Sequence, residues 1–255
     1  MLALERHRRL LDLLNERGSV RTAEAARTLG VTEETVRRDF EKLEADGALL
    51  RSHGGAVKLE AARREFPARE RALQHAGEKL RIARAAVARI RPGQTILFDA
   101  STTALQVAKL LPDQPLTVVT NALQTALVLV EKPAIHVTLL GGTLVASSQS
   151  CTGWSAEQML ELFRIDTAYI SCRGFDVQRG PSEATEEQAR LKRRIVECAE
   201  EVCLLADASK VGVSSSFYFA KSADIDLWIT DAAPARSVRE ALSGQGVRIE
   251  VPGRK

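Results

Sequence analysis

The sequence predicts a chain of two unlike parts. The first is an N-terminal winged helix-turn-helix, all α with a small β wing, and the second is a C-terminal α/β domain with a largely parallel sheet. Two observations carry this prediction: residues 1–58 contain three short helical patterns followed by a hairpin pattern, and from residue 77 onward short Val/Ile/Leu-rich runs alternate with helical runs. The expected boundaries are 1–58, a linker at 59–76, and 77–255.

Composition excludes several classes of protein. The chain has 255 residues, of which 45% are hydrophobic and 27% charged, which is ordinary for a globular protein of more than one domain. No apolar run approaches the ~20 residues that span a bilayer, and the start, "MLALERHRRLLDLLNERG", lacks the apolar core of a signal peptide. We therefore expect a cytoplasmic protein with no membrane partner.

The cysteines and histidines indicate neither a metal nor a cofactor. Cys151, Cys172, Cys198 and Cys203 form no CxxC pair, and the four histidines have no metal-ligand spacing. Small buried thiols in a reducing compartment are the expected state. The net charge of +3 is likewise too small to indicate nucleic acid, so any such case depends on where the arginines lie.

The first two helices are marked by leucine spacing and by glycines. "HRRLLDLLNERG" repeats leucine at helical intervals and stops at Gly18. "RTAEAARTLG" begins at Thr22, a candidate N-cap, and stops at Gly30. Two short helices that meet at a Gly-containing turn are typical of a helix-turn-helix, whose second helix enters the major groove.

The third helix carries two arginines beside a buried face. Thr32 can cap it, and Val36, Phe40 and Leu43 share one face. Arg37 and Arg38 project away from that face or flank it, and an arginine can bond a guanine edge or a phosphate. The alternative is a solvated charged face paired with the neighbouring glutamates.

A hairpin pattern follows this helix. In "GALLRSHGGAVKL", Gly47 ends the helix, residues 48–51 form a strand, 53–55 a turn, and a second strand begins at Ala56. A hairpin after a recognition helix is a wing, which carries basic residues towards the phosphates or the minor groove. The candidate DNA contacts are Thr22, Thr32, Glu33, Thr35, Arg37, Arg38, Arg51, His53, Gly54 and Lys58.

The stretch "VRTAEAARTLGVTEETVRRDFEKLEADGALLRSHGGAV" resembles the N-terminal domain of DeoR-type bacterial repressors. In that family a Thr-apolar-Arg-Arg-Asp run and a terminal Arg-x-His-Gly-Gly-Ala wing recur. The resemblance covers residues 3–58. It implies that Arg37 and Arg38 belong to the recognition helix and that double-stranded operator DNA is the partner, but not which bases they contact.

The expected linker mixes charges around Pro67, and we expect it to be partly helical and ordered through Phe66 and Leu73. Beyond it, helices and strands alternate, as in a parallel sheet covered on both sides. The expected strands are 95–98, 116–119, 136–140, 168–171, 202–206, 227–230 and 247–251, and the expected helices are 77–90, 103–111, 123–130, 156–162, 187–199 and 235–242.

Polar or glycine-bearing loops follow five of these strands: "DASTT", "TN", "GGT", "SCRG" and "ADASK". The carboxyl ends of parallel strands form one edge, where ligands bind, and helix starts with hydroxyls and lysine make an anion site. Helix capping, tight turns or a plain surface lysine would explain each loop taken alone. The candidates from this pattern are Ser101, Thr102, Thr103, Thr120, Asn121, Gly141, Gly142 and Lys210.

Residues 76–232 also resemble the C-terminal sensor domain of the DeoR family, through "TILFDASTT", "LTVVTNAL", "VTLLGGTL", "TGWSAEQMLELFRIDTAYIS", "EEQARLKRRI" and "LLADASKVG". That domain is similar in fold to ribose-5-phosphate isomerase and the CoA-transferase group, and senses phosphorylated sugars or related metabolites. The resemblance implies that the effector contacts include Asp99, Thr102, Thr103, Asn121, Gly142, Asp176, Glu187, Lys192, Asp207 and Lys210.

Two positions depart from the family pattern. Ser101 stands where the family usually has glycine, so its side chain either hinders an approaching ligand or adds a donor. Cys172 and Arg173 stand where many relatives have small residues. We hypothesise that Arg173 faces the ligand, with an ion pair to Asp176 or Glu183 as the alternative. A Cys172 thiol of lowered pKa, acting as a redox sensor, is a further hypothesis.

Together these observations predict a regulator of transcription, a repressor of carbohydrate-metabolism genes that an anionic, phosphorylated sugar releases from its operator. A homodimer or homotetramer is expected, because paired DNA-binding domains read paired half-sites. The alternatives are an activator of the same architecture and an isomerase-like enzyme that uses Asp99, Asp176, Glu187, Lys192 and Lys210.

Overall fold

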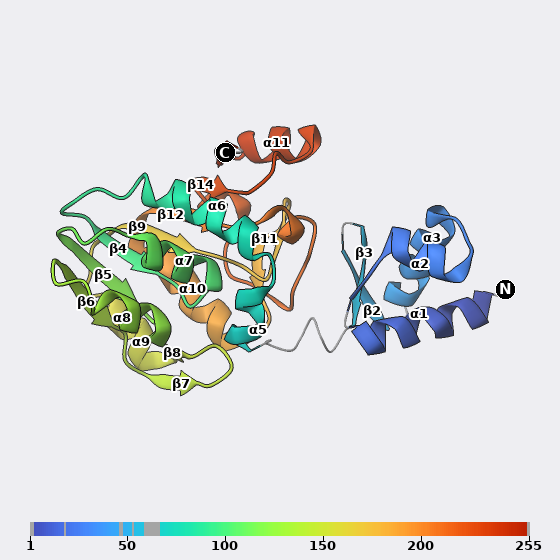
Figure 1. The fold of residues 1–255 in the computed structure, drawn as a ribbon, viewed down its shortest axis with the longest axis horizontal. Coiled ribbons are helices and arrows are strands. Elements are labelled where there is room, and N and C mark those ends of the chain that lie inside the picture. The colour runs from blue at the N-terminus through green and yellow to red at the C-terminus, as the bar shows by residue number, and fades with distance from the viewer. Residues whose placement is uncertain (1–2, 18, 46–47, 53, 59–66, 254–255) are drawn as a thin grey trace.

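The computed structural model describes residues 3–17, 19–45, 48–52, 54–58 and 67–253 (Figure 1). The N-terminal part is a winged helix-turn-helix, as predicted. Its helices are α1 (Ala3–Arg17), α2 (Thr22–Leu29) and α3 (Glu33–Ala45), and its strands are β1 (Ser19–Arg21), β2 (Leu49–Ser52) and β3 (Gly55–Lys58). The predicted end of α1 at Gly18 and of α3 at Gly47 lie outside the described residues.

Strand β1 was not expected from the sequence. It pairs antiparallel with β3, so the wing is a three-stranded sheet in the order β1-β3-β2. Gly55 makes this possible, because a Cβ at that position would lie 2.2 Å from the carbonyl oxygen of Val20. The core beneath the sheet packs Leu10, Leu14 and Phe40 with neighbouring apolar side chains.

The C-terminal part is a seven-stranded parallel sheet in the order β15-β14-β12-β9-β4-β5-β6. All seven predicted strands are confirmed, with ends shifted by up to three residues. Their bounds are β4 (Thr95–Phe98), β5 (Leu116–Thr120), β6 (Ile135–Leu139), β9 (Ile165–Ile170), β12 (Ala199–Leu205), β14 (Leu227–Ile229) and β15 (Arg248–Glu250).

Helices cover both faces of this sheet (Figure 1). Because side chains alternate along a strand, Ile96 and Phe98 join one apolar cluster and Leu97 joins the other. The first cluster includes residues of α6 (Ala76–Val87), α7 (Thr102–Leu110) and α8 (Leu123–Leu129), and the second includes residues of α9 (Trp154–Leu160), α10 (Glu186–Cys198) and α11 (Arg236–Ser243).

Smaller elements decorate the sheet, and the sequence pattern did not reveal them. They are the hairpin β7 (Thr143–Val145) and β8 (Ser150–Thr152), the small sheet β10 (Gly174–Asp176), β11 (Gly180–Glu183) and β13 (Phe217–Tyr218), and the 3₁₀ turns η1 (Ala208–Lys210) and η2 (Ser222–Asp224). These segments are only two to four residues long, too short for a periodic pattern to show.

The expected linker contains a described helix, α5 (Ala68–Leu73). The prediction that Leu73 helps to order this segment is wrong, because Leu73 is 83% exposed. Phe66 lies outside the described residues. Polar contacts hold α5 instead, including a hydrogen bond from Ala68 N to Ser147 O of 2.9 Å. The domain boundaries themselves stay a prediction.

In the described part of the chain, no helix combines the length and the apolar character needed to cross a membrane.

Candidate DNA-binding surface and effector site

The start of α3 is fixed by a hydroxyl cap. Gly30, in the left-handed conformation with φ of 65°, ends α2, and the Thr35 N–H donates to Thr32 Oγ1 at 3.2 Å. The predicted cap at Thr32 is therefore confirmed. Both Thr32 and Glu33 are exposed, and Thr35 is half-buried with its hydroxyl 2.8 Å from that of Thr32.

Arg37 and Arg38 stand on the exposed side of α3, opposite the buried Val36 and Phe40. Arg37 pairs with Glu33 at 3.2 Å, and Arg38 pairs with Glu34 at 3.3 Å. Such exposed i,i+4 pairs contribute only about 0.3–0.5 kcal/mol. Both guanidinium groups can therefore exchange these partners for a base edge or a phosphate.

The other DNA candidates have different environments. Thr22 is not an N-cap: Arg21 holds that position, and Thr22 is buried, with its N–H donating to Gly54 O at 2.7 Å. Thr22 thus anchors the wing turn, where Gly54 has a φ of 94°. Arg51 is bonded to Glu41 of α3 at 2.8 Å. His53 and the side chain of Lys58 lie outside what the structure describes.

A buried carboxylate that the sequence did not suggest anchors α3 on α1. Asp39, 4% exposed, accepts hydrogen bonds from Arg6 and His7 of α1. Burial alone would raise the pKa of Asp39, but the hydrogen bonds from Arg6 and His7 outweigh it and lower the pKa. The aspartate of the Arg-Arg-Asp run therefore holds the helix in place while the two arginines face outward.

The second candidate site lies where the strand order of the large sheet reverses. Strand β4 has β5 on one side and β9 on the other, and ligands bind in open α/β sheets at the carboxyl ends of such strands. Asp99, which follows β4, accepts hydrogen bonds from Ser101 N at 3.0 Å and from Ser171 N at 2.9 Å. The carboxylate thereby ties the two loops together.

Lys192 of α10 lies beneath these loops. Its ammonium bonds Asp99 at 2.9 Å, Ser171 O at 2.6 Å and also Glu183, and the residue is 5% exposed. Burial would lower its pKa, but the two carboxylates more than offset this and raise it. Asp99 and Lys192 therefore form a charged base for the loops.

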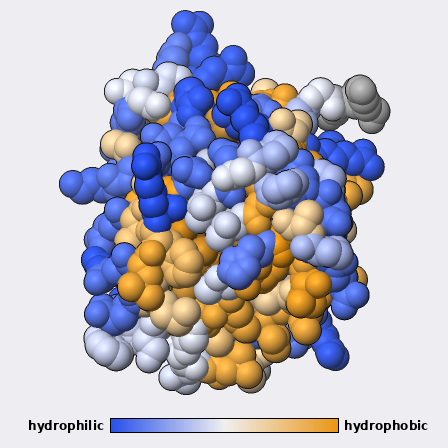
Figure 2. Space-filling model, turned by 90° about the vertical axis from the view of Figure 1, so that its left-hand side faces the viewer, coloured by the Kyte–Doolittle hydropathy of each residue, from blue (hydrophilic) through white to orange (hydrophobic). Residues whose placement is uncertain are grey.

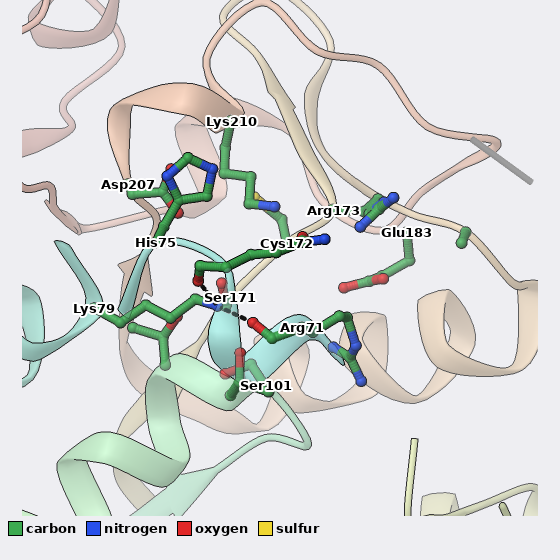
Figure 3. Close-up of a pocket in the computed structure, with 14 residues that line it drawn as sticks. Arg71, His75, Lys79, Ser101, Ser171, Cys172, Arg173, Glu183, Asp207 and Lys210 are labelled. Atoms are coloured by element: carbon green, nitrogen blue, oxygen red, sulfur yellow. Dashed lines mark hydrogen bonds between the residues drawn. The ribbon is translucent and has the colours of Figure 1, made fainter. Parts of the chain in front are cut away.

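A pocket opens above this base (Figure 3). Three of its walls are the loops that follow β4, β9 and β12, and the fourth is the corner between α5 and α6. Glu183 and Ala184, at the end of β11, complete the lining. Among the predicted effector contacts, the structure brings Ser101, Thr102, Thr103, Arg173, Asp207 and Lys210 together in this lining. Sequence reasoning missed Arg71, Gln74, His75 and Lys79, which also line the pocket.

Cations dominate the pocket. Lys79 donates from Nζ to the carbonyl oxygens of Arg71 and Gln74, the latter at 2.7 Å (Figure 3). Burial and the charge of Lys210 lower the pKa of Lys79 to about 8. Burial also lowers the pKa of Lys210, and the charge of Arg173 adds to this. Crowded, desolvated cations of this kind gain most from a bound anion.

The acids and the helix start at the pocket are already engaged. Asp207 caps η1: its carboxylate accepts from Ser209 N at 3.0 Å and from the Ser209 hydroxyl. Ser101 Oγ accepts from Ala104 N at 3.0 Å and caps α7, whose N-terminus opens at the pocket. A helix N-terminus attracts anions because its N–H groups and dipole point outward.

The following predicted effector contacts lie outside the pocket lining, and most of them have hydrogen-bond or packing partners elsewhere in the protein. The Thr120 hydroxyl donates to Phe98 O at 2.8 Å, and Asn121 Nδ2 donates to Cys151 O at 3.1 Å. Gly142 has a φ of 129°, with Thr152 O so close that a Cβ would lie at 2.5 Å. The others are Gly141, whose N–H lies 3.2 Å from Met159 Sδ, Asp176, which accepts from Gln178 N at 2.8 Å, and Glu187, which is exposed on α10.

The hypothesis that the Cys172 thiol has a lowered pKa, as a redox sensor would need, is wrong. Burial raises the pKa of its thiol to about 12, so the thiolate is disfavoured. All four cysteines are free. The described residues also contain no group of His, Cys, Asp and Glu that could hold a metal ion.

Comparisons with known proteins cover both parts of the chain. Residues 6–62 match the DeoR-like helix-turn-helix domain, and residues 74–232 match the DeoR C-terminal sensor domain. The chain is 40% identical to the uncharacterized HTH-type transcriptional regulator YulB of Bacillus subtilis (strain 168), over 98% of this chain and 96% of that protein. It is 31% identical to the glycerol-3-phosphate regulon repressor of Escherichia coli (strain K12), over 98% of this chain and 100% of that protein.

Solved structures resemble parts of the chain more distantly. Ribose 5-phosphate isomerase A from Methanocaldococcus jannaschii matches with a TM-score of 0.40 and 14% identity, over 54% of this chain and 55% of that one. The tetrameric eIF2B-beta2-delta2 complex from C. thermophilum matches with a TM-score of 0.47 and 15% identity, over 69% of this chain and 62% of that one.

The near-full-length relatives are named as regulators of transcription, which confirms the expected regulator over the isomerase-like alternative. With both family domains present and in order, the chain belongs to the DeoR family of DNA-binding transcriptional regulators.

Proposed function

We propose that this regulator represses carbohydrate-metabolism genes and that a small anionic sugar metabolite, phosphorylated at one end, releases it from operator DNA. The observation that carries the effector half is the pocket at the strand-order reversal. Arg71, Lys79, Arg173 and Lys210 gather there beside the N-terminus of α7. A phosphate group combines two negative charges with several acceptor oxygens, and so matches this arrangement better than a neutral sugar does.

The charge balance supports an anion rather than a cation as the ligand. Glu183 is bonded to Lys192, and Asp207 accepts from Ser209, so both acids of the lining have partners within the protein. Lys79 donates to carbonyl oxygens, which carry no full charge. The lining therefore holds more basic than acidic side chains, and a bound anion would bring its charge closer to balance.

The names of relatives agree with this chemistry. One is the glycerol-3-phosphate regulon repressor of Escherichia coli (strain K12), and another, 34% identical over 95% of this chain, is the HTH-type transcriptional repressor GlcR of Bacillus subtilis (strain 168). Those names describe those proteins, and they support a carbohydrate metabolite and a repressor role here.

A thermal-shift panel tests the effector half. The full-length protein is melted with inorganic phosphate, sugar phosphates of three to six carbons, sugar acids, and the neutral parent sugars. We expect stabilisation by anionic members alone, because a ligand that binds the native state raises the melting temperature by mass action. Lys210→Met should abolish the shift. Stabilisation by the neutral sugars, or by no member at all, contradicts the proposal.

For the DNA half, we propose that α3 enters the major groove with Arg37 and Arg38 facing the duplex. The effector then favours a state that fits DNA poorly, which lowers operator affinity. Reporter expression with the gene deleted separates repression from activation: the target genes rise for a repressor and fall for an activator.

We propose further that the protein acts as a homodimer or homotetramer. Exposed apolar side chains on and around α8, β7 and α9 include Leu127, Val130, Leu144 and Trp154. Figure 2 shows a broad apolar area on the side of the molecule where these elements lie. Apolar surface gathered in this way is typical of association sites. Sedimentation should give an oligomer of the wild type, and Trp154→Glu with Leu127→Glu should give the monomer.

A further inference from the structure

A second cavity lies next to the cationic pocket. Both cavities are lined by Ser101 and Thr102, and α5 contributes to both, with Arg71 on one side and Ala68 and Ala72 on the other. We call the second cavity the neutral compartment, because every residue of its lining except the exposed Arg69 is uncharged. It is lined by Ala68, Arg69, Ala72, Ala100, Ser101, Thr102, Leu105, Ala122, Gln124, Thr125, Ser148 and Gln149.

Size separates the two cavities. The cationic pocket has a volume of about 50 Å³ and the neutral compartment about 170 Å³. The neutral compartment is therefore the roomier of the two, and the carbon chain of an effector held by its charged end would extend into it from the cationic pocket.

The neutral compartment contains a buried hydroxyl whose hydrogen bonding is incomplete. Thr125 is fully buried on α8, and its Oγ1 has no hydrogen-bond partner among the described residues. Asn121 lies before the start of α8 and outside this lining; it is 2% exposed, and its Oδ1 also lacks a partner among the described residues. Buried polar atoms rarely stay unpaired, and a ligand hydroxyl at Thr125 would restore one such bond.

Backbone strain marks both cavities. Within the described residues, the two non-glycine residues with positive φ are His75 at 54° and Gln149 at 52°. His75 lines the cationic pocket, and Gln149 lines the neutral compartment. Strained residues of this kind collect at binding sites, where the surrounding structure holds them in place.

We propose that the neutral compartment is the second half of the effector site and takes the hydroxylated carbon chain of a ligand whose charged end lies in the cationic pocket. This inference rests on the proposed function, since it needs the anion to bind first. The apolar wall of Ala68, Ala72 and Leu105 would contact carbon atoms, while Thr125 and Gln149 would contact hydroxyl groups. The effector is then an open-chain or ring sugar phosphate rather than a bare inorganic anion.

The test compares a short probe with long ones in the full-length protein. Inorganic phosphate is the short probe, and sugar phosphates of three to six carbons are the long ones, with dissociation constants measured by calorimetry. Wild type should bind at least one sugar phosphate more tightly than inorganic phosphate. Thr125→Val keeps the shape but removes the hydroxyl, and should weaken that sugar phosphate about three- to tenfold while leaving inorganic phosphate unchanged.

A second variant fills the cavity. Ala72→Met should weaken the long probe at least as much as Thr125→Val does, and the matched control, Leu73→Gln at the exposed neighbour on α5, should change neither probe. Melting without ligand checks that each variant is folded.

The outcomes separate the two proposals. If inorganic phosphate binds but no sugar phosphate binds more tightly, or if the variants weaken both probes equally, the neutral compartment is not part of the site while the anion pocket survives. If no anion binds, the proposed function fails and this inference fails with it.

Discussion

The two surfaces that this chain offers to its partners hold their charges in opposite ways. On α3, Arg37 and Arg38 are exposed and paired with glutamates one turn away. At the strand ends, Lys192 is buried and bonded to Asp99, Glu183 and a carbonyl oxygen. Weakly held charges can change partners when DNA arrives, whereas a buried charge that loses its partners is left without compensation. Exposed, weakly paired charges therefore suit recognition of DNA, and buried, fully paired charges suit the support of the loops around the pocket.

The largest effect is expected from breaking the buried cluster. Lys192→Ala leaves the buried Asp99 and the half-buried Glu183 without their common cation, and should destabilise the protein by about 3–5 kcal/mol in urea unfolding. Glu187→Ala, on the exposed side of the same helix, is the matched control and should stay within about 0.5 kcal/mol. A loss of effector affinity with unchanged stability in Lys192→Ala would show instead that this lysine binds the ligand directly.

Substitutions of the exposed arginines on α3 should have the opposite pattern: little effect on stability and a clear effect on DNA binding. Arg37→Ala or Arg38→Ala should leave the unfolding free energy within about 0.5 kcal/mol of wild type, because each removes only an exposed ion pair. Affinity for specific operator should fall by about 1–3 kcal/mol if the side chain reads a base. An arginine that contacts phosphate alone should weaken all DNA sequences alike and reduce the salt slope by about one. Titrations of operator and random DNA at several salt concentrations distinguish the two.

We expect an effect of intermediate size from the titration of Lys79, which is buried like Lys192 but donates to carbonyl oxygens rather than to carboxylates. Burial, the charge of Lys210 and the charge of Arg71 lower its pKa to about 8, while Asp207 and Glu78 oppose this. Above pH 8 the free protein loses this proton, so binding of a sugar phosphate must take it up again. Affinity should fall with rising pH, by up to about tenfold per unit.

The lowered pKa of Lys79 has the opposite effect on protein stability, which should rise with pH while effector affinity falls. Between pH 8 and 10.5 the folded state binds fewer protons at Lys79 than the unfolded state, so stability contributed by this group rises with pH. Lys79→Arg keeps its charge over the range and should reduce the slope of the affinity profile, leaving the part due to Lys210, whose pKa burial also lowers. Calorimetry from pH 7 to 9.5, where a sugar phosphate stays doubly ionised, provides the measurement. A flat wild-type profile would remove Lys79 from the anion site.

Features set by a local pattern could be predicted from the sequence, whereas features set by tertiary contacts could not. The sheet was predictable strand by strand, because buried parallel strands form short apolar runs such as Thr95–Phe98. It was also predictable that the loops after β4, β9 and β12 line one pocket, because parallel topology brings strand ends to one edge. Thr120 and Asn121 share that edge, but their hydrogen bonds to Phe98 and Cys151 depend on tertiary neighbours that no local pattern reveals.

The fourth wall of the pocket was missed for a different reason. Arg71, His75 and Lys79 recur every four residues in "RERALQHAGEK", a spacing that predicts one basic helical face, whereas the structure has a corner between α5 and α6. The segment was assigned to a linker because its charges are mixed. Its fold back onto the strand ends depends on Lys79 bonding the carbonyl oxygens of Arg71 and Gln74, a contact that a charge pattern cannot distinguish from solvation.

The smallest effect is expected at Ser101, where the family usually has glycine. Because Ser101 Oγ caps α7, Ser101→Ala should destabilise the protein by about 1 kcal/mol, and Ser101→Gly by only a few tenths. The oxygen accepts from Ala104 N, so its own proton can be donated into the pocket that the residue lines. Both variants should therefore lower sugar-phosphate affinity by about two- to fivefold. A rise in affinity for Ser101→Gly alone would show instead that the side chain hinders approach to the helix N-terminus.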